Sequence, residues 1–326
     1  MKNIPERVQL AHLPTPIHKL DRLSQELGKN IYLKRDDYTG TEVSGNKVRK
    51  LEFAAKEALQ QKSDVLITCG GLQSNHARAT AAVARRLGLK CHLVLRGTPA
   101  DSWTGNLFLD KMLGADITFL EPDLFNERHM DIMEDIKHDY AQKQMTAYLL
   151  PVGASNGIGT FGYYAAYDEI CQQEKDSDQY FDAIVTAVGS GGTCGGLVLG
   201  NWHHHRKHRI IGIPIADDAA YFQEIIQSIM HDASLLVGWN EVPNLGSYQL
   251  IDGYAGRGYA LNTPEEMAFI ESIAQKEGVL LDPVYTGKAF RGLVEEIRKG
   301  SFDGLNDILF IHTGGLFGIF DKTEAF

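Results

Sequence analysis

The chain has 326 residues, of which 44% are hydrophobic and 23% charged, and its formal net charge at pH 7 is −10. These are the values of an ordinary globular protein that is long enough for two domains, and the negative charge argues against nucleic acid as a partner, because nucleic acid binding depends on clustered lysine and arginine. No signal-like apolar stretch opens the chain and no later run reaches the length of a membrane span, so we expect no membrane partner and a cytoplasmic location.

Short β-branched runs alternate along the chain with longer segments of helical spacing. Strands are predicted at residues 31–34, 64–69, 91–95, 116–120, 183–188, 210–214 and 308–311. Helices are predicted between them, including residues 46–60, 73–87, 159–172, 194–203 and 264–276. This alternation indicates the α/β fold class, with parallel sheets covered by helices.

No low-complexity linker and no internal repeat divides the chain, so any domain boundary has to lie in ordinary loops. The best candidates for a crossing between domains are the loops at 40–45 and 151–157. If the chain crosses between domains at both loops, residues 1–48 plus 155–326 form a large domain and residues 49–154 form a small domain. A ligand is expected in the cleft between them.

Lys47 and a distant glycine-rich turn carry the main chemical signal. Lys47 lies where a strand-like run gives way to a helical pattern, and its amine can form an imine with an aldehyde. The turn Gly189-Ser190-Gly191-Gly192-Thr193 follows an apolar strand and opens a helix, so its N–H groups and hydroxyls can bind a phosphate. Pyridoxal 5′-phosphate carries both an aldehyde and a phosphate. The alternative is that these glycines serve packing only, since the spacing matches neither a P-loop nor GxGxxG with a following acidic residue.

Two other regions place polar side chains at predicted strand ends. The turn from Gly70 to His76 opens a helix whose N–H groups, with the Ser74 hydroxyl, suit a carboxylate, although Ser74 or Asn75 could simply cap that helix. His76 could carry protons or only pack. Later in the chain the hydroxyl side chains are Tyr285, Thr286 and Thr313, for which a core aromatic and turn residues are the alternatives.

Three further groups are predicted to be structural. The four cysteines, Cys69, Cys91, Cys171 and Cys194, have no disulfide or zinc spacing, so we expect buried free thiols. The histidines within residues 203–208 resemble a metal cluster, but without Asp or Cys at ligand spacing a solvated helix end is favoured and no metal is predicted. The charged run at 34–37 favours a local ion-pair network over a catalytic acid and base.

Eight motifs occur in order along nearly the whole chain: LPTPIHKLDRL, KRDDYTG, GNKVRKLEF, LQSNHARATAA, PVGASNGIGTFGY, GSGGT, LDPVYTGKAF and ILFIHTGG. Together they resemble the fold-type II pyridoxal-phosphate enzymes, and within them the group of D-cysteine desulfhydrases and 1-aminocyclopropane-1-carboxylate deaminases. The resemblance implies two open, mainly parallel sheets with helices on both faces, as in tryptophan synthase β. It also implies pyridoxal 5′-phosphate as cofactor, a small amino acid as substrate and a homodimer.

The resemblance assigns roles to individual residues. Lys47 is expected to hold the cofactor covalently and Asn75 to hydrogen-bond its phenolic oxygen. The other cofactor-binding residues are expected to be Gly189, Ser190, Gly191, Gly192, Thr193, Thr313 and Lys50. The substrate-binding residues are expected to be Ser74, Asn75, His76, Tyr285 and Thr286, and the catalytic side chains Lys47, Tyr285, Ser74 and Tyr259.

Two positions separate the members of the group. In the cyclopropane deaminases the segment matching Val284-Tyr285-Thr286-Gly287 reads VYEG, and leucine takes the place of Thr313. A glutamate near the pyridine nitrogen keeps it protonated and makes the ring a strong electron sink, whereas a threonine forms only a neutral hydrogen bond. The weaker sink suits β-elimination, which predicts conversion of D-cysteine to pyruvate, hydrogen sulfide and ammonia. The alternatives are deamination of the cyclopropane amino acid, an L-cysteate sulfo-lyase, and a non-catalytic protein that binds a phosphometabolite.

Overall fold

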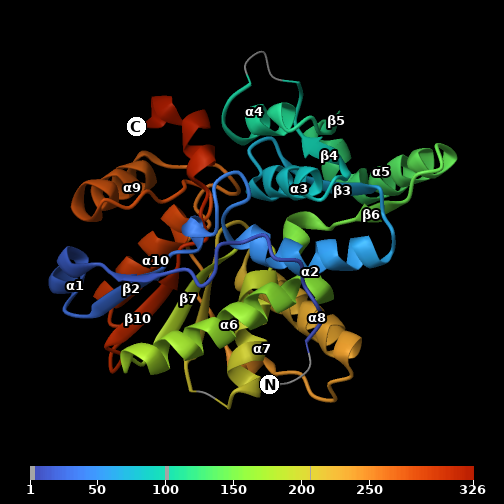
Figure 1. The fold of residues 1–326 in the computed structure, drawn as a ribbon. Helices are drawn as coiled ribbons and strands as arrows, with labels where there is room; N and C mark the ends of the chain where they lie inside the picture. Colours follow the sequence, from blue (N-terminus) through green and yellow to red (C-terminus); the bar gives the residue numbers. More distant parts are fainter. Residues whose placement is uncertain (1–3, 100–102, 206) are drawn as a thin grey trace.

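Two separate β-sheets organise the chain in the computed structural model, which describes residues 4–99, 103–205 and 207–326 (Figure 1). The six-stranded sheet has the order β1 (Ile17–Lys19), β2 (Asn30–Lys34), β10 (Asp307–Ile311), β7 (Ala183–Val188), β8 (Arg209–Pro214) and β9 (Gln249–Leu250). The four-stranded sheet has the order β5 (Asp116–Leu120), β4 (Lys90–Arg96), β3 (Val65–Gly71) and β6 (Ala147–Leu149).

Neighbouring strands run parallel in both sheets, except at one edge of the six-stranded sheet. Strand β1 pairs with β2 in the antiparallel sense, and every other pair of neighbours is parallel. The predicted α/β class and all seven predicted strands are therefore confirmed. The three strands that the sequence did not reveal, β1, β6 and β9, have only two or three residues, which is too short for a recognisable pattern.

Ten α-helices within the described residues connect and cover the strands: α1 (Asp21–Leu27), α2 (Asn46–Gln60), α3 (Asn75–Arg86), α4 (Gly105–Met112), α5 (Pro122–Gln142), α6 (Gly157–Ser177), α7 (Gly192–His203), α8 (Ala219–Val237), α9 (Pro264–Glu277) and α10 (Thr286–Arg298). Strands β3 to β6 occupy residues 65–149, inside the range predicted for a small domain. The domain boundaries themselves stay a prediction.

Helix α2 lies between the four-stranded sheet with its helices and the helices that cover the six-stranded sheet. It contacts α3 on one side and α6 on the other, and Figure 1 shows it between the group of α3, β3 and β6 and the group of α6 and α8. Gly162 of α6 makes this approach close, since a Cβ there would lie 2.5 Å from the backbone of Arg49. The backbone of α2 is therefore fixed against α6 by direct contact.

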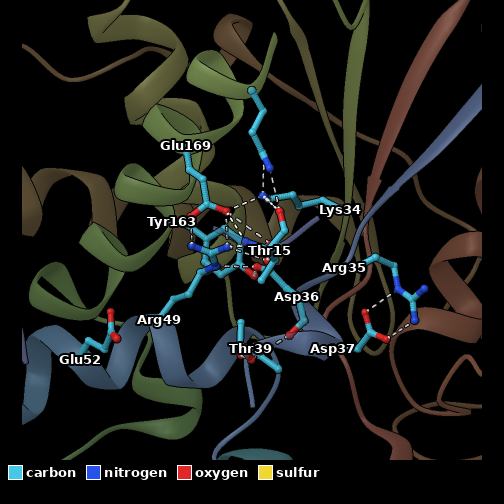
Figure 2. A network of polar contacts seen from close by, with 12 residues as sticks. Thr15, Lys34, Arg35, Asp36, Asp37, Thr39, Arg49, Glu52, Tyr163 and Glu169 are labelled. Atoms are coloured by element: carbon cyan, nitrogen blue, oxygen red, sulfur yellow. Dashed lines mark hydrogen bonds and ion pairs between the residues drawn. The ribbon is translucent and has the colours of Figure 1, made fainter. Parts of the chain in front are cut away.

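A buried ion network, formed by Lys34, Asp36, Arg49 and Glu169, also fixes α2 (Figure 2). The Arg49 guanidinium donates to both carboxylate oxygens of Asp36 at 2.8 Å and to Glu169 of α6 at 3.0 Å. Burial alone would raise the pKa of Asp36, but the Arg49 charge holds that pKa below its usual value. The network confirms that the charged run at 34–37 forms ion pairs, although Arg49, the partner of Asp36, lies 13 residues further along the chain.

Other predicted structural groups have mixed outcomes. All four cysteines are buried and lie outside any disulfide, as expected. The solvated helix end predicted for the histidines is wrong for His208, which is buried because its ring contacts α6: Nδ1 lies 2.5 Å from the Tyr167 hydroxyl and Nε2 lies 2.9 Å from Glu174 Oε1. Among the residues that the structure describes there is no group of three metal-binding side chains, and no helix that is long and apolar enough to cross a membrane.

Candidate active site

A cavity of about 490 Å³ lies at the carboxyl ends of strands from both sheets. Its wall includes the ends of β3 and β4 in one sheet, and the segments that follow β7, β8 and β10 in the other. The first residues of α2, α3 and α7 also line it. In parallel α/β sheets this edge is the usual ligand site, because loop residues and helix N-termini converge there.

Lys47, the second residue of α2, lines this cavity and is only 8% exposed. Its amine lies 5.6 Å from the centre of the Tyr285 ring and has no hydrogen bond to any described residue. Burial lowers the pKa of Lys47 to about 8, against the opposing charge of Asp282. An amine with this pKa is neutral often enough near pH 7.5 to act as a nucleophile.

We expect the reactivity of Lys47 to report this pKa. In the cofactor-free protein about a quarter of the Lys47 amine is neutral at pH 7.5, against about 0.1% of an ordinary lysine. Labelling by trinitrobenzenesulfonate, followed by peptide mass spectrometry, should therefore show a Lys47 rate that rises through a midpoint near pH 8. A midpoint above about 10, as for ordinary surface lysines, would contradict the environment described here.

The glycine turn between β7 and α7 offers donors to an anion. Gly191 has φ of +83°, a conformation that suits glycine and leads the chain directly into α7. The Thr193 hydroxyl oxygen accepts a hydrogen bond of 3.0 Å from the Asn46 side-chain amide, which leaves the hydroxyl proton free to be donated. The N-terminal N–H groups of α7 add to this donor set.

Lys50 stands behind the same turn. Its amine lies 2.8 Å from Ser155 Oγ, and Ser155 Oγ lies 2.8 Å from Ser190 Oγ. Burial, and then the charge of Lys47, lowers the pKa of Lys50 well below its usual value. A dianion bound beside Ser190 would supply the counter-charge that Lys50 lacks, so the environment of Lys50 fits a phosphate group at this turn.

Aromatic and hydroxyl side chains form the wall facing the lysine. The hydroxyl groups of Tyr259 and Tyr285 are 2.6 Å apart, and burial raises the pKa of both. Ser74 is the N-cap of α3, where its Oγ accepts from the Ala77 N–H at 3.2 Å. His76 is buried with Nε2 2.8 Å from Thr68 Oγ1, and burial lowers the pKa of this imidazole well below its usual value.

The structure brings most of the predicted site residues to one cavity. The predicted residues that line it are Lys47, Ser74, His76, Gly189, Ser190, Gly191, Thr193, Tyr259, Tyr285 and Thr313. Four others do not line it. Gly192 begins α7, and Lys50 bonds Ser155. Asn75 accepts from Asn106 at 2.9 Å, and the Thr286 hydroxyl donates to Asp282 at 2.7 Å.

Several lining residues were not predicted from the sequence. Asn46 precedes Lys47 and bonds Thr193, a link that the GNK motif could have indicated. Besides Lys47, the charged residues of the lining are Arg96, Asp217, Asp321 and Lys322, which come from three segments far apart in the chain, so no local pattern connects those segments.

The cavity therefore has a nucleophilic amine and, elsewhere in its wall, a turn with convergent donors for a dianion. Pyridoxal 5′-phosphate needs both, because it is attached through its aldehyde and held by its phosphate. Fold and site together define a two-sheet α/β enzyme of the pyridoxal-phosphate class.

Comparison with known proteins gives the family. Residues 8–314 match the family described as pyridoxal-phosphate dependent enzyme, and the chain belongs to this family. It is 41% identical to the bifunctional D-cysteine desulfhydrase/1-aminocyclopropane-1-carboxylate deaminase of Arabidopsis thaliana, covering 97% of this chain and 79% of that protein. It is 42% identical to a putative 1-aminocyclopropane-1-carboxylate deaminase of Thermotoga maritima, with coverage of 98% and 99%. It is 36% identical to D-cysteine desulfhydrase of Serratia proteamaculans, with coverage of 96% and 95%.

Solved structures agree with this assignment. A crystal structure described as an ACC deaminase homologue superposes with a TM-score of 0.90 at 39% identity, covering 98% of this chain and 95% of the other. A threonine deaminase structure superposes with a TM-score of 0.63 at 18% identity over 92% of each chain, which supports the fold alone. The predicted family, fold type and cofactor are thus confirmed.

Proposed function

We propose that this enzyme is a lyase that eliminates hydrosulfide from D-cysteine and, with one water consumed, releases pyruvate, hydrogen sulfide and ammonia. Relatives named for this reaction and relatives named for cyclopropane deamination are similarly distant from the chain. The choice between the two therefore depends on the site of this chain.

The positions of the carboxylates near the cavity support elimination over cyclopropane deamination. Among the described residues that line the cavity, the only carboxylates are Asp217 and Asp321, and both are exposed. Asp282 is buried nearby, but it accepts four hydrogen bonds, from the N–H groups of 284, 285 and 286 and from the Thr286 hydroxyl. Thr313, which carries a hydroxyl, is among the residues that line the cavity. A pyridine nitrogen beside Thr313 would receive only a neutral hydrogen bond, which supports elimination over ring opening.

Lys47 is proposed to hold the cofactor and to move the substrate proton. When bound, the cofactor supplies an aldehyde and an electron-withdrawing ring that stabilises negative charge at the substrate Cα. The Lys47 amine, with its pKa near 8, is suited both to covalent attachment and to accepting the Cα proton near neutral pH. Residues 189–193, with Lys50 behind them, are proposed to bind the phosphate.

Ser74 and the tyrosine pair are proposed to bind and orient the substrate. The Ser74 oxygen accepts from Ala77, so its proton remains for a substrate carboxylate at the N-terminus of α3. The neutral hydroxyls of Tyr259 and Tyr285 share one hydrogen bond, so one proton of the pair remains for the leaving sulfur. His76 is proposed to line the carboxylate site in its neutral form.

A product assay tests the proposal. We expect sulfide and pyruvate in equal amounts from D-cysteine, and pyruvate from β-chloro-D-alanine, because both carry a leaving group on Cβ. Formation of 2-oxobutyrate from the cyclopropane amino acid as the main activity, or of sulfite from L-cysteate, would contradict the proposed substrate. An enzyme with a covalently attached cofactor should have a visible absorption band that borohydride removes. If the purified protein lacks such a band, a binding protein without catalytic activity is favoured instead. The predicted homodimer and cytoplasmic location stay predictions.

A further inference from the structure

The side-chain amide of Asn106 lies directly behind the start of α3. Asn106 is fully buried at the second position of α4. Its Oδ1 accepts from Arg78 Nε at 2.8 Å, and its Nδ2 donates to the main-chain carbonyl of Gln73 and to Asn75 Oδ1, both at 2.9 Å. The chain of contacts therefore runs from Arg78 through Asn106 to Asn75.

The chemistry of the end groups fixes the orientation of both amides. A guanidinium has only donors and a main-chain carbonyl only accepts, so the oxygen of Asn106 has to face Arg78 and its nitrogen has to face Gln73. The same nitrogen contacts Asn75, so Asn75 has to present its oxygen to Asn106. Both N–H groups of Asn75 are then directed away from Asn106 and remain available as donors.

Arg78 is itself held in place as a charged group. It is 1% exposed, it donates to the main-chain carbonyl of Glu42, and its guanidinium lies 5.1 Å from the centre of the Phe317 ring. Burial lowers the pKa of Arg78 to about 10, against the opposing charge of the buried Asp110. Arg78 therefore stays protonated at neutral pH and cannot accept a hydrogen bond from Asn106.

We propose that Asn106, oriented by Arg78, is a positioning residue that makes Asn75 a hydrogen-bond donor to the phenolic oxygen of the cofactor. The inference rests on the proposed function, together with the expectation from the family resemblance that Asn75 hydrogen-bonds that oxygen. Asn75 does not line the cavity itself, but it lies between Ser74 and His76, which both do. An Asn75 amide with the reversed orientation would place its oxygen against the phenolic oxygen, and the two acceptors would repel.

The substitution Asn106→Asp tests the orientation directly. The new carboxylate can still accept from Arg78, but it has no N–H group for Gln73 or Asn75, so Asn75 is driven to turn its own N–H groups toward it. We expect the dissociation constant of pyridoxal 5′-phosphate, measured by fluorescence titration, to rise about 10-fold. The pH midpoint of the visible spectrum of the bound cofactor should rise by about one unit, because a donor at the phenolic oxygen lowers its affinity for a proton.

Further variants distinguish positioning from a general loss of structure. Asn75→Ala should shift the spectral midpoint in the same direction, and the double variant with Asn106→Asp should shift it no further than the larger single change. Asn106→Ala, which introduces no charge, should produce a smaller shift. The matched control is Asn201→Asp in α7, whose buried amide bonds Tyr167 and the His208 carbonyl outside the cavity, and it should leave the midpoint unchanged.

The outcomes separate this inference from the proposed function. If Asn106→Asp and Asn106→Ala both bind the cofactor with the wild-type midpoint and dissociation constant, Asn106 is only structural and the inference is wrong. An equal shift in Asn201→Asp would contradict it as well. A wild-type protein that binds no pyridoxal 5′-phosphate would defeat the proposed function itself.

Discussion

Replacement of Lys47 with alanine is expected to reduce turnover of D-cysteine by at least about 10³-fold, since both covalent attachment and proton transfer depend on this amine. Lys50 cannot take over the role, because its amine lies 2.8 Å from Ser155 behind the glycine turn and does not line the cavity. The measurement is steady-state pyruvate formation at saturating D-cysteine, with the variant saturated with pyridoxal 5′-phosphate.

The matched control is Lys56→Ala, nine residues further along α2. Lys56 pairs at 3.0 Å with Glu6, whose side chain is 74% exposed, so its loss should leave turnover close to wild type. Wild-type turnover by the Lys47→Ala enzyme would show that another group carries the chemistry. A parallel loss in both variants would point to damage to α2 and not to a missing amine.

The second large effect is expected on stability, from Arg49→Met in the buried ion network. Asp36 and Arg49 are both fully buried, so removing the guanidinium leaves the Asp36 carboxylate without the charged partner that bonds both of its oxygens. Breaking a buried pair in this way costs about 3 to 5 kcal/mol. Urea unfolding of the cofactor-free protein should show this loss as a lower midpoint at an unchanged slope.

Arg298→Met is the matched control for this change. Arg298 has a 57% exposed side chain and pairs with Glu26 at 2.6 Å, and such surface pairs contribute about 0 to 1 kcal/mol. A similar small loss for Arg49→Met would contradict the view that the network fixes α2. If the network does fix α2, Arg49→Met should also weaken cofactor binding, because Lys47 lies two residues before Arg49 on the same helix.

Much of this fold could be predicted because its strands are buried and parallel. The run at 183–188 is buried at every position, and such runs are recognisable from composition alone. Strand β9 has only two residues and is held by its pairing with β8, which no local sequence pattern records. His208 was misplaced for a similar reason, since its burial depends on Glu174 and Tyr167 of α6.

The candidate site also contains some residues that could be predicted from the sequence and others that could not. Lys47 and residues 189–193 could be predicted because reactive groups and glycines at a strand end have a direct chemical meaning. Thr286 was expected to bind substrate, yet its hydroxyl is engaged by Asp282 four residues earlier, a geometry that depends on how the turn folds. The roles of Asn106 and Arg78 could not be predicted either, because they arise from contacts 28 and 31 residues apart in the chain.

The proposed function requires a covalent bond between the cofactor and Lys47. Borohydride reduction of the purified holoenzyme, followed by trypsin digestion and mass spectrometry, tests it most directly. Trypsin cuts after Arg35 and after Arg49, so Lys47 and Lys50 fall in different peptides. We predict that the added cofactor mass appears on the peptide of residues 36–49, at Lys47. Its appearance on Lys50 or on any other lysine, or its absence from the protein, would show that Lys47 does not hold the cofactor.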